Sequence, residues 1–258
     1  MTEYLLFRLY GPMASWGEIA VGESRHSAVH PSRSALVGLL GAALGLRRDE
    51  DAAQQALIDG YRFAMKVESA GTPLRDYHTV QAPPARKNVV YRTRARELET
   101  RQVLETLLSM REYRCDALAV VAVEALVAAR WTLGELAGAL RRPVFPLYLG
   151  RKSCPPALPL APQMVQAANL REAFAARQRS LLALVREFGE TDTDWPARED
   201  VRALRLRRDT VRYCWEDGME AGMEPDMQTV RIDQPLSRRR WQFAPRRESV
   251  HFERGGER

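Results

Sequence analysis

Residues 117–129, ALAVVAVEALVAA, form a long apolar run that Glu124 alone interrupts. Such a run, rich in valine, is typical of a strand buried on both faces at the centre of a sheet. The shorter run at residues 3–10 is apolar and aromatic, and it predicts a second buried strand that ends at Gly11-Pro12. We therefore expect a sheet built around these two segments.

Helical patterns separate the predicted strands. Pro31 and Ser32 form the start signal of a helix, and the leucines that follow recur at the spacing of a single helical face. Residues 51–59 form a second short helix before a strand at residues 61–68. A helical pattern also covers residues 97–110.

A second unit of strand, helix and strand begins at residue 117. Thr132, with Glu135 three residues later, forms a capping box that starts a helix over residues 132–140. The run at residues 144–148, VFPLY, predicts the last strand. With an insertion between its two halves, this is the βαββαβ order of ferredoxin-like and RRM-like domains.

The composition changes after residues 155–162, which contain four prolines and read as a linker. Further strands are predicted at residues 203–215 and 227–243. We therefore predict an α+β fold, with a ferredoxin-like or RRM-like domain at residues 1–158 and a small β-rich C-terminal domain at residues 159–258.

The bulk composition favours an anionic partner. The net charge is +6 and the pI about 9.5, but only three of the 39 basic residues are lysine, a bias that genomic base composition also explains. Three widely spaced cysteines without a CxxC pair predict free thiols in a reducing cytoplasm, with no metal site or cofactor. No apolar stretch reaches the roughly 20 residues that cross a bilayer, and the N-terminus lacks the pattern of a signal peptide.

Gly150, Arg151 and Lys152 lie between the predicted strand at residues 144–148 and Pro155-Pro156. A rigid turn of this kind presents backbone N–H groups and cations to an anion, most plausibly a phosphate. A solvated surface turn is the alternative.

The run at residues 86–96 contains Lys87 and four arginines but no acidic residue. On a strand, Arg92, Arg94 and Arg96 would share one face, where an anion would relieve their mutual repulsion. The alternative is an edge strand that its charges protect from aggregation.

Arg75, Tyr77 and His78 lie close together in a third segment, and Arg111 begins a similar one. Tyr77 and His78 are suited to stacking on bases or to acid–base chemistry, and they are equally compatible with ordinary strand positions. The alternative for Arg111 is a simple salt bridge with its neighbour Glu112.

Five segments in this order resemble the CasD family, the fifth Cas subunits of type I-E CRISPR Cascade, within the RAMP superfamily of RNA-binding proteins. They are residues 9–17 (LYGPMASWG), 31–41 (PSRSALVGLLG), 74–80 (LRDYHTV), 111–117 (REYRCDA) and 148–155 (YLGRKSCP). The resemblance covers about residues 1–160. It implies a ferredoxin-like domain with a protruding β thumb, here at about residues 81–108, and a small C-terminal domain.

The resemblance also implies binding of the crRNA 5′ handle beside the backbone and large subunits of Cascade, and contact with target DNA through the assembled complex. Arg33 and Ser34 begin a helix, whose N–H groups favour phosphate. The candidate RNA-binding residues are Trp16, Arg33, Ser34, Arg75, Tyr77, His78, Lys87, Arg92, Arg94, Arg96, Arg111, Tyr148, Arg151 and Lys152.

The sequence therefore predicts a non-catalytic, cytoplasmic RNA-binding subunit for antiviral defence, without a membrane partner. The alternative is a metal-independent endoribonuclease that processes precursor crRNA, as in the type I-C relatives, with His78 or Tyr77 as base and Lys152 as the cation. A general RNA-binding protein would explain the charge but not the five ordered segments.

Overall fold

A computed structural model describes residues 1–20, 22–84, 89–99, 104–176, 210–238 and 240–254. Within these ranges the protein is built on a nine-stranded sheet, in which β10-β11-β9-β5-β7-β1-β8 are consecutive neighbours and β3 and β6 pair with β7. The strands are β1 (Thr2–Ala14), β2 (Trp16–Gly17), β3 (Ser24–Arg25), β4 (Ser27–Ala28), β5 (Tyr61–Ser69), β6 (Thr72–Ala82), β7 (Glu105–Ala125), β8 (Gln163–Ala167), β9 (Thr210–Glu216), β10 (Met227–Ser237) and β11 (Gln242–Arg254). The helices are α1 (Arg33–Leu44), α2 (Asp51–Asp59), α3 (Arg94–Glu99), α4 (Leu133–Arg141) and α5 (Leu170–Ala175).

The two apolar runs lie at the centre of the sheet, as predicted, except that β7 ends at Ala125 and residues 126–129 are not part of the strand. β7 pairs antiparallel with β1 on one side and with β5 on the other. Alternate residues of β1 enter two cores: Leu5 and Phe7 face α1 and α4, while Tyr4 and Leu6 face α5 on the opposite side. Both faces are therefore covered, which explains why these strands are apolar without alternation.

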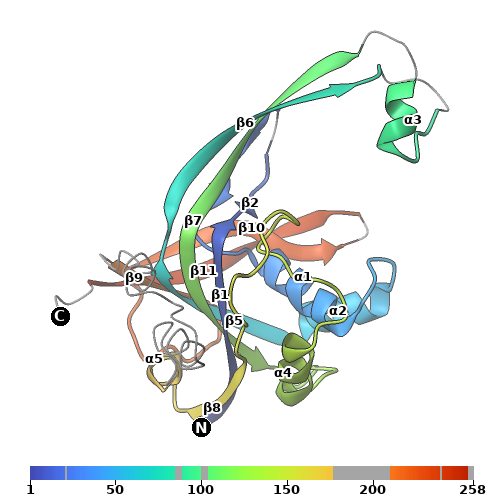
Figure 1. Cartoon of the computed structure of the whole chain (residues 1–258). Coiled ribbons are helices and arrows are strands. Elements are labelled where there is room, and N and C mark those ends of the chain that lie inside the picture. The colour runs from blue at the N-terminus through green and yellow to red at the C-terminus, as the bar shows by residue number, and fades with distance from the viewer. Residues whose placement is uncertain (21, 85–88, 100–103, 177–209, 239, 255–258) are drawn as a thin grey trace, which may run out of the picture.

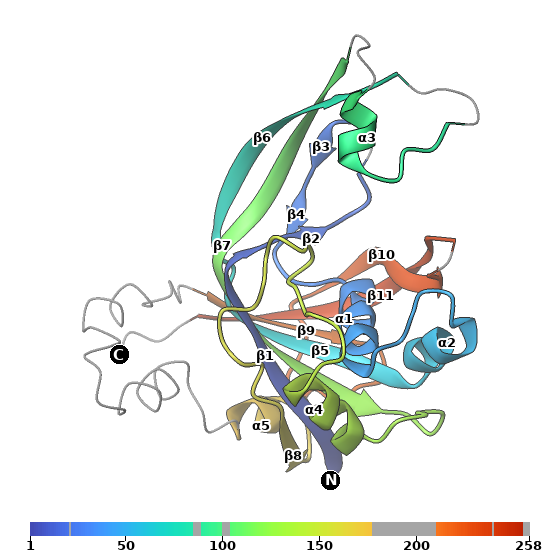
Figure 2. The same cartoon turned by 45° about the vertical axis from the view of Figure 1, so that its right-hand side comes forward.

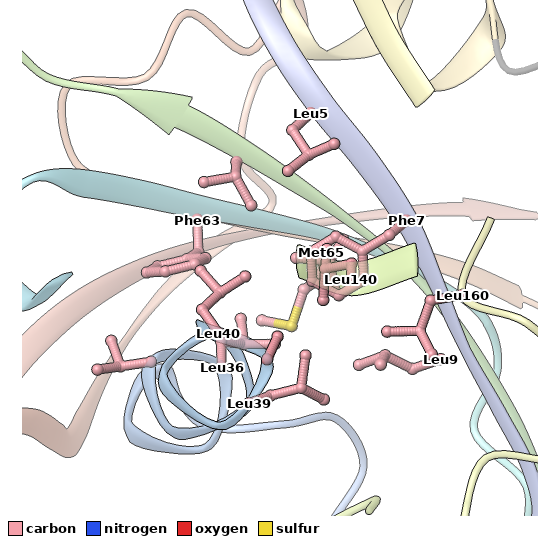
Figure 3. Packing of buried hydrophobic residues seen from close by; sticks show 14 of the residues in the cluster. Leu5, Phe7, Leu9, Leu36, Leu39, Leu40, Phe63, Met65, Leu140 and Leu160 are labelled. Atoms are coloured by element: carbon pink, nitrogen blue, oxygen red, sulfur yellow. The ribbon is translucent and has the colours of Figure 1, made fainter. Parts of the chain in front are cut away.

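The larger core lies between the sheet and helices α1, α2 and α4. Figure 3 shows Leu36 and Leu40 of α1 directed toward Phe63 and Met65 of β5. All four side chains are almost completely buried. Full burial of a side chain of this size contributes about 1.5–3 kcal/mol, so the packing fixes α1 firmly on the sheet.

The helix starts predicted from local signals are confirmed. The Ser32 side chain accepts a hydrogen bond from the Ala35 N–H at the start of α1, and α2 spans residues 51–59 as predicted. Thr132 and Glu135 form the expected capping box of α4.

Three predicted elements are wrong. β1 continues past Gly11-Pro12, because Met13 and Ala14 still pair with β7. Residues 97–110 are not one helix, since α3 ends at Glu99 and β7 begins at Glu105. Residues 144–148 are not a strand: the N–H groups of Val144 and Phe145 donate instead to carbonyls at the C-terminal end of α1.

A long hairpin of β6 and β7 projects from the body of the protein and carries α3 at its tip (Figures 1 and 2). Its pairing runs from Thr72 with Cys115 to Ala82 with Glu105. The hairpin leaves the body at Gly71, which has φ +67° and whose missing Cβ would lie 2.5 Å from the Cys115 carbonyl oxygen. Only glycine fits this position.

The C-terminal part extends both edges of the same sheet. β8 pairs with β1, whereas β9 pairs with β5 and continues into β11 and β10. The predicted strand at residues 227–243 is divided into β10 and the start of β11. The N-terminal part of the predicted strand at residues 203–215 lies outside the described residues, and the domain division at residue 158 stays a prediction.

Candidate nucleic-acid interface

The predicted basic face at the hairpin tip takes a different form from the one expected. Arg94 and Arg96 belong to α3, and residues two apart on a helix do not share a face. The Arg94 guanidinium also donates to Glu97, with N–O 2.6 Å. The prediction that Arg92, Arg94 and Arg96 alternate on a strand is therefore wrong, although all three are exposed. Lys87 lies outside the described residues.

The hairpin distributes four further candidates over its two faces. Arg75 and Tyr77 lie on one face, and His78 lies on the other face with Arg111, because strand residues alternate and cross-strand partners share a face. Tyr77 is 62% exposed, so its ring is available for stacking. The His78 Nε2 contacts the Asp76 carboxylate.

Glu112 joins the hairpin to the segment before α1. Its carboxylate accepts hydrogen bonds from Arg75, at 3.0 Å, and from the Ser27 N–H, and it lies 3.2 Å from His26 Nδ1. Burial by itself would raise the pKa of Glu112, but the hydrogen bonds from His26 and Arg75 lower it. The salt bridge of Glu112 is therefore with Arg75 across the strands, not with its neighbour Arg111.

The predicted basic turn is present at the base of the hairpin. Gly150 has φ +88°, and a Cβ there would lie 1.8 Å from the Ser15 carbonyl oxygen. The turn is closed by a hydrogen bond from the Cys154 N–H to the Arg151 carbonyl. Arg151 stacks over the Tyr113 ring, 5.0 Å from its centroid, whereas Lys152 is exposed. The turn therefore presents two cations from a rigid backbone.

The prediction that Arg33 contacts RNA is wrong. Its side chain is 5% exposed, and its guanidinium pairs with Glu216 and donates to the carbonyls of Ile58 and Tyr61. Its backbone N–H donates to Asp233 at 2.9 Å. A carboxylate of the protein thus occupies the helix N-terminus where we expected a phosphate, and Arg33 stabilises the fold from inside.

Three other candidates line one cavity of about 640 Å³: Trp16, Ser34 and Tyr148. The cavity lies between α1, the segment before the basic turn, and the hairpin of β10 and β11. Trp16 is mostly buried, whereas Tyr148 is 40% exposed. Arg238 and Trp241 also line this cavity, which the sequence did not indicate.

A buried charged cluster lies next to this cavity, joined to it by Arg231. His30, Cys214 and Glu248 place potential metal ligands within 4.8 Å of one another. Arg231 Nη1 lies 2.8 Å from His30 Nδ1, and Arg246 donates to Glu248 at 2.9 Å, so cations of the protein already occupy these groups. Burial and the nearby Glu248 raise the pKa of Cys214 to about 12, which keeps the thiol protonated. The group suits a structural hydrogen-bond network better than a metal.

This cluster predicts acid sensitivity. Burial alone would raise the pKa of Glu248, but the hydrogen bond from His30 and the cations Arg231 and Arg246 lower it from 4.5 to about 2. A lowered carboxyl pKa contributes stability above pH 4.5 that is lost as the pH falls toward 2. We expect the free energy of unfolding to fall by up to about 3 kcal/mol over that range as Glu248 becomes protonated.

Chemical denaturation at a series of pH values measures this loss. Glu248→Gln should be less stable than wild type at pH 7, and its stability should fall less steeply below pH 5. Parallel pH profiles for the two proteins would contradict the role of Glu248.

No helix in the described ranges is long and apolar enough to cross a membrane. Cys115, Cys154 and Cys214 are free thiols, as predicted. Among the candidate residues, those that remain exposed bring cations and aromatic rings to the hairpin, the basic turn and the cavity. Together they suit a single-stranded nucleic acid, whose phosphates need cations and whose bases stack on aromatic rings.

Comparison with known proteins identifies the family. The profile described as "CRISPR-associated protein (Cas_Cas5)" matches residues 4–248. The protein named "CRISPR system Cascade subunit CasD" from Escherichia coli (strain K12) is 37% identical over 182 residues, which cover 67% of this chain and 76% of that protein.

Solved structures agree over nearly the whole length. A chain of a structure titled "CRISPR RNA-guided surveillance complex" is 26% identical, with a TM-score of 0.62 and coverage of 97% of this chain and 90% of that one. A structure titled "Crystal structure of Cas protein" is 25% identical, with a TM-score of 0.55 and coverage of 97% and 94%. Because the family profile spans most of its length, this chain belongs to the Cas5 family of CRISPR-associated proteins.

Proposed function

We propose that this protein is a non-catalytic crRNA-binding subunit of a type I-E Cascade complex and that it holds the crRNA 5′ handle. The observation that carries the proposal is the similarity to CasD, together with a rigid basic turn at the base of a projecting hairpin. Its partners are then the crRNA, the backbone and large subunits, and target DNA through the assembled complex.

We further propose that β1, α1, β5, β7, α4 and β8 form a ferredoxin-like unit. Two observations support this: the sheet order β5-β7-β1-β8, and antiparallel pairing between each of these neighbours. The thumb inserted into this unit is the hairpin of β6 and residues 105–115 of β7, together with α3. Because β8 of this unit spans Gln163–Ala167, the C-terminal domain begins after β8 in this proposal rather than at residue 159, and it joins the unit through the pairing of β9 with β5.

The arrangement of the candidate base and cation favours binding over catalysis. Arg151, next to Lys152, contacts Tyr113, whose strand partner is Leu74. His78 instead pairs with Ser109, which lies four residues before Tyr113 in β7 and so about 13 Å nearer the hairpin tip. General acid–base catalysis needs groups within hydrogen-bond reach of the same reacting atoms.

We therefore expect no cleavage of precursor crRNA by the purified protein in EDTA. The measurement is a denaturing gel of end-labelled precursor RNA after incubation with wild type and with His78→Ala. Site-specific products that disappear in His78→Ala would contradict the proposal and establish the endoribonuclease alternative.

Replacement of both Arg151 and Lys152 by Ala should weaken handle binding. Arg151 is half-buried and Lys152 is exposed, so each should contribute about 1 kcal/mol to binding. Loss of both should weaken the affinity roughly 30-fold. Loss of two phosphate contacts should also reduce the slope of log K against log salt by about 1.4. Filter binding of handle RNA over a salt series measures both quantities.

The matched control is Arg130→Ala with Arg142→Ala. These two exposed arginines flank α4, and their removal changes the net charge by the same amount. The control should retain wild-type affinity and slope. Equal losses in the two double variants would show that net charge alone drives binding.

A further inference from the structure

Trp241, at the turn between β10 and β11, lines the cavity described above. The side chain is 52% exposed, although most tryptophans are largely buried. Its ring lies beside Phe243, with centroids 6.0 Å apart. Its backbone has φ 51°, a left-handed conformation that a bulky residue rarely adopts. The fold therefore holds an aromatic surface open at the cavity edge.

Two arginines lie next to this ring. The guanidinium carbons of Arg48 and Arg238 are 4.6 and 5.9 Å from the ring centroid. Arg238 donates to the carbonyl of Ser34 at 2.9 Å, and both residues line the cavity. Burial, and then repulsion by Arg48, lower the pKa of Arg238.

Arg238 is half-buried and Arg48 is exposed, and both differ from three enclosed arginines of the described residues. Arg33, Arg231 and Arg246 each pair with buried carboxylates. For Arg48 and Arg238, the described residues provide no carboxylate within salt-bridge distance. The carboxylates on the cavity wall, Glu18 and Asp233, lie instead near Arg231. The end of the cavity around Arg238 is thus a partly buried positive site to which the described residues bring no carboxylate.

Gly38 makes room for this arrangement. It lies on α1 at the cavity wall, and a Cβ there would be 2.8 Å from the Arg238 Nη2. Glycine in a helix interior costs about 1 kcal/mol of stability relative to alanine. Gly38 therefore makes α1 less stable than alanine would, but it leaves the space that the Arg238 guanidinium occupies.

We propose that this cavity binds one unstacked nucleotide, with the base against Trp241 and Tyr148 and a phosphate at Arg238; Arg48, beside the Trp241 ring, adds positive charge outside the cavity lining. The volume of about 640 Å³ lies in the range of small-ligand sites. Aromatic rings with adjacent arginines are the usual means of holding unstacked bases. The inference rests on the proposed function, since the RNA handle would supply the nucleotide; a free nucleotide has the same chemistry.

The test compares Gly38→Ala with Gly138→Ala by fluorescence anisotropy of a labelled eight-nucleotide adenylate RNA at low salt. Gly138 lies in α4, and a Cβ there meets no atom within 4 Å. Both variants should melt at or above the wild-type temperature. Gly38→Ala should bind the RNA about tenfold more weakly because it displaces Arg238, and Gly138→Ala should bind normally. Trp241→Ala should lose a similar factor.

A titration with AMP separates the two sources of the nucleotide. Weak AMP binding that Gly38→Ala and Trp241→Ala both abolish, with the RNA losses above, supports a site for a nucleotide within a chain. A higher affinity for AMP than for the RNA would overturn the proposal of a nucleotide within a chain and would indicate a site for a free nucleotide.

Three further outcomes distinguish the nucleotide site from the proposed function. Wild-type RNA affinity in Gly38→Ala and Trp241→Ala, while Arg151→Ala with Lys152→Ala is weakened, would overturn the nucleotide site and leave the proposed function intact. Normal RNA affinity with failure to join the other Cascade subunits would reassign the cavity to a protein partner. No RNA binding by the wild type would count against both proposals.

Discussion

Arg33→Ala should lower the free energy of unfolding by about 3–5 kcal/mol and leave the RNA affinity of the folded protein unchanged. The substitution leaves the Glu216 carboxylate buried without its cation, and it removes the donor to the carbonyls of Ile58 and Tyr61. For a protein of this size, the melting temperature should fall by roughly 10 °C. Thermal unfolding and RNA binding at 20–25 °C measure the two effects.

The control for this prediction is the double variant Arg33→Met with Glu216→Met. Replacement of a whole buried ion pair by apolar residues of similar size is often neutral, so the double variant should recover most of the lost stability. The opposite pattern, with normal stability and lost RNA affinity in Arg33→Ala, would restore Arg33 to the RNA interface.

Gly150→Ala should destabilise the protein by about 4 kcal/mol. The left-handed conformation at φ +88° adds about 1–2 kcal/mol for any residue with a Cβ, and the 1.8 Å approach to the Ser15 carbonyl adds the rest. The carbonyl belongs to the backbone, so no side-chain rotation relieves the contact. Variants that fold should also bind handle RNA more weakly, because the basic turn is displaced.

Gly22→Ala separates the two causes. Gly22 has φ +76°, but a Cβ there meets no atom within 4 Å, so only the conformational part of the loss applies. Urea denaturation should show a loss of about 1–2 kcal/mol in Gly22→Ala, well below that of Gly150→Ala. Equal losses would mean that the turn does not pack rigidly against Ser15.

The elements predicted correctly are those with local signals. Ser32 and Thr132 cap their helices through bonds to residues three positions away, so a short window of sequence contains the whole interaction. The strands β1 and β7 were recognisable because burial on both faces requires apolar residues throughout. The hairpin was missed at residues 105–110 because its hydrogen bonds are to β6, more than 20 residues earlier.

The candidate site was less predictable, since its residues meet across the fold. Arg33 looked like a phosphate ligand because Glu216, its partner, lies 183 residues later in the chain. Arg238 was not among the candidates, because nothing near Gly38 or Trp241 in the sequence indicates that these residues share a cavity with it. The basic turn was found because Gly150, Arg151 and Lys152 are contiguous.

The most direct test of the proposed function is photo-crosslinking within the assembled complex. Cascade would be assembled around crRNA that carries 4-thiouridine at single positions of the 5′ handle, irradiated, digested and analysed by mass spectrometry. We predict cross-links from handle positions to peptides of this chain that contain Lys152 or Trp241, with the crRNA intact. Cross-links from the handle only to other subunits, while this chain is present in the complex, would contradict the account.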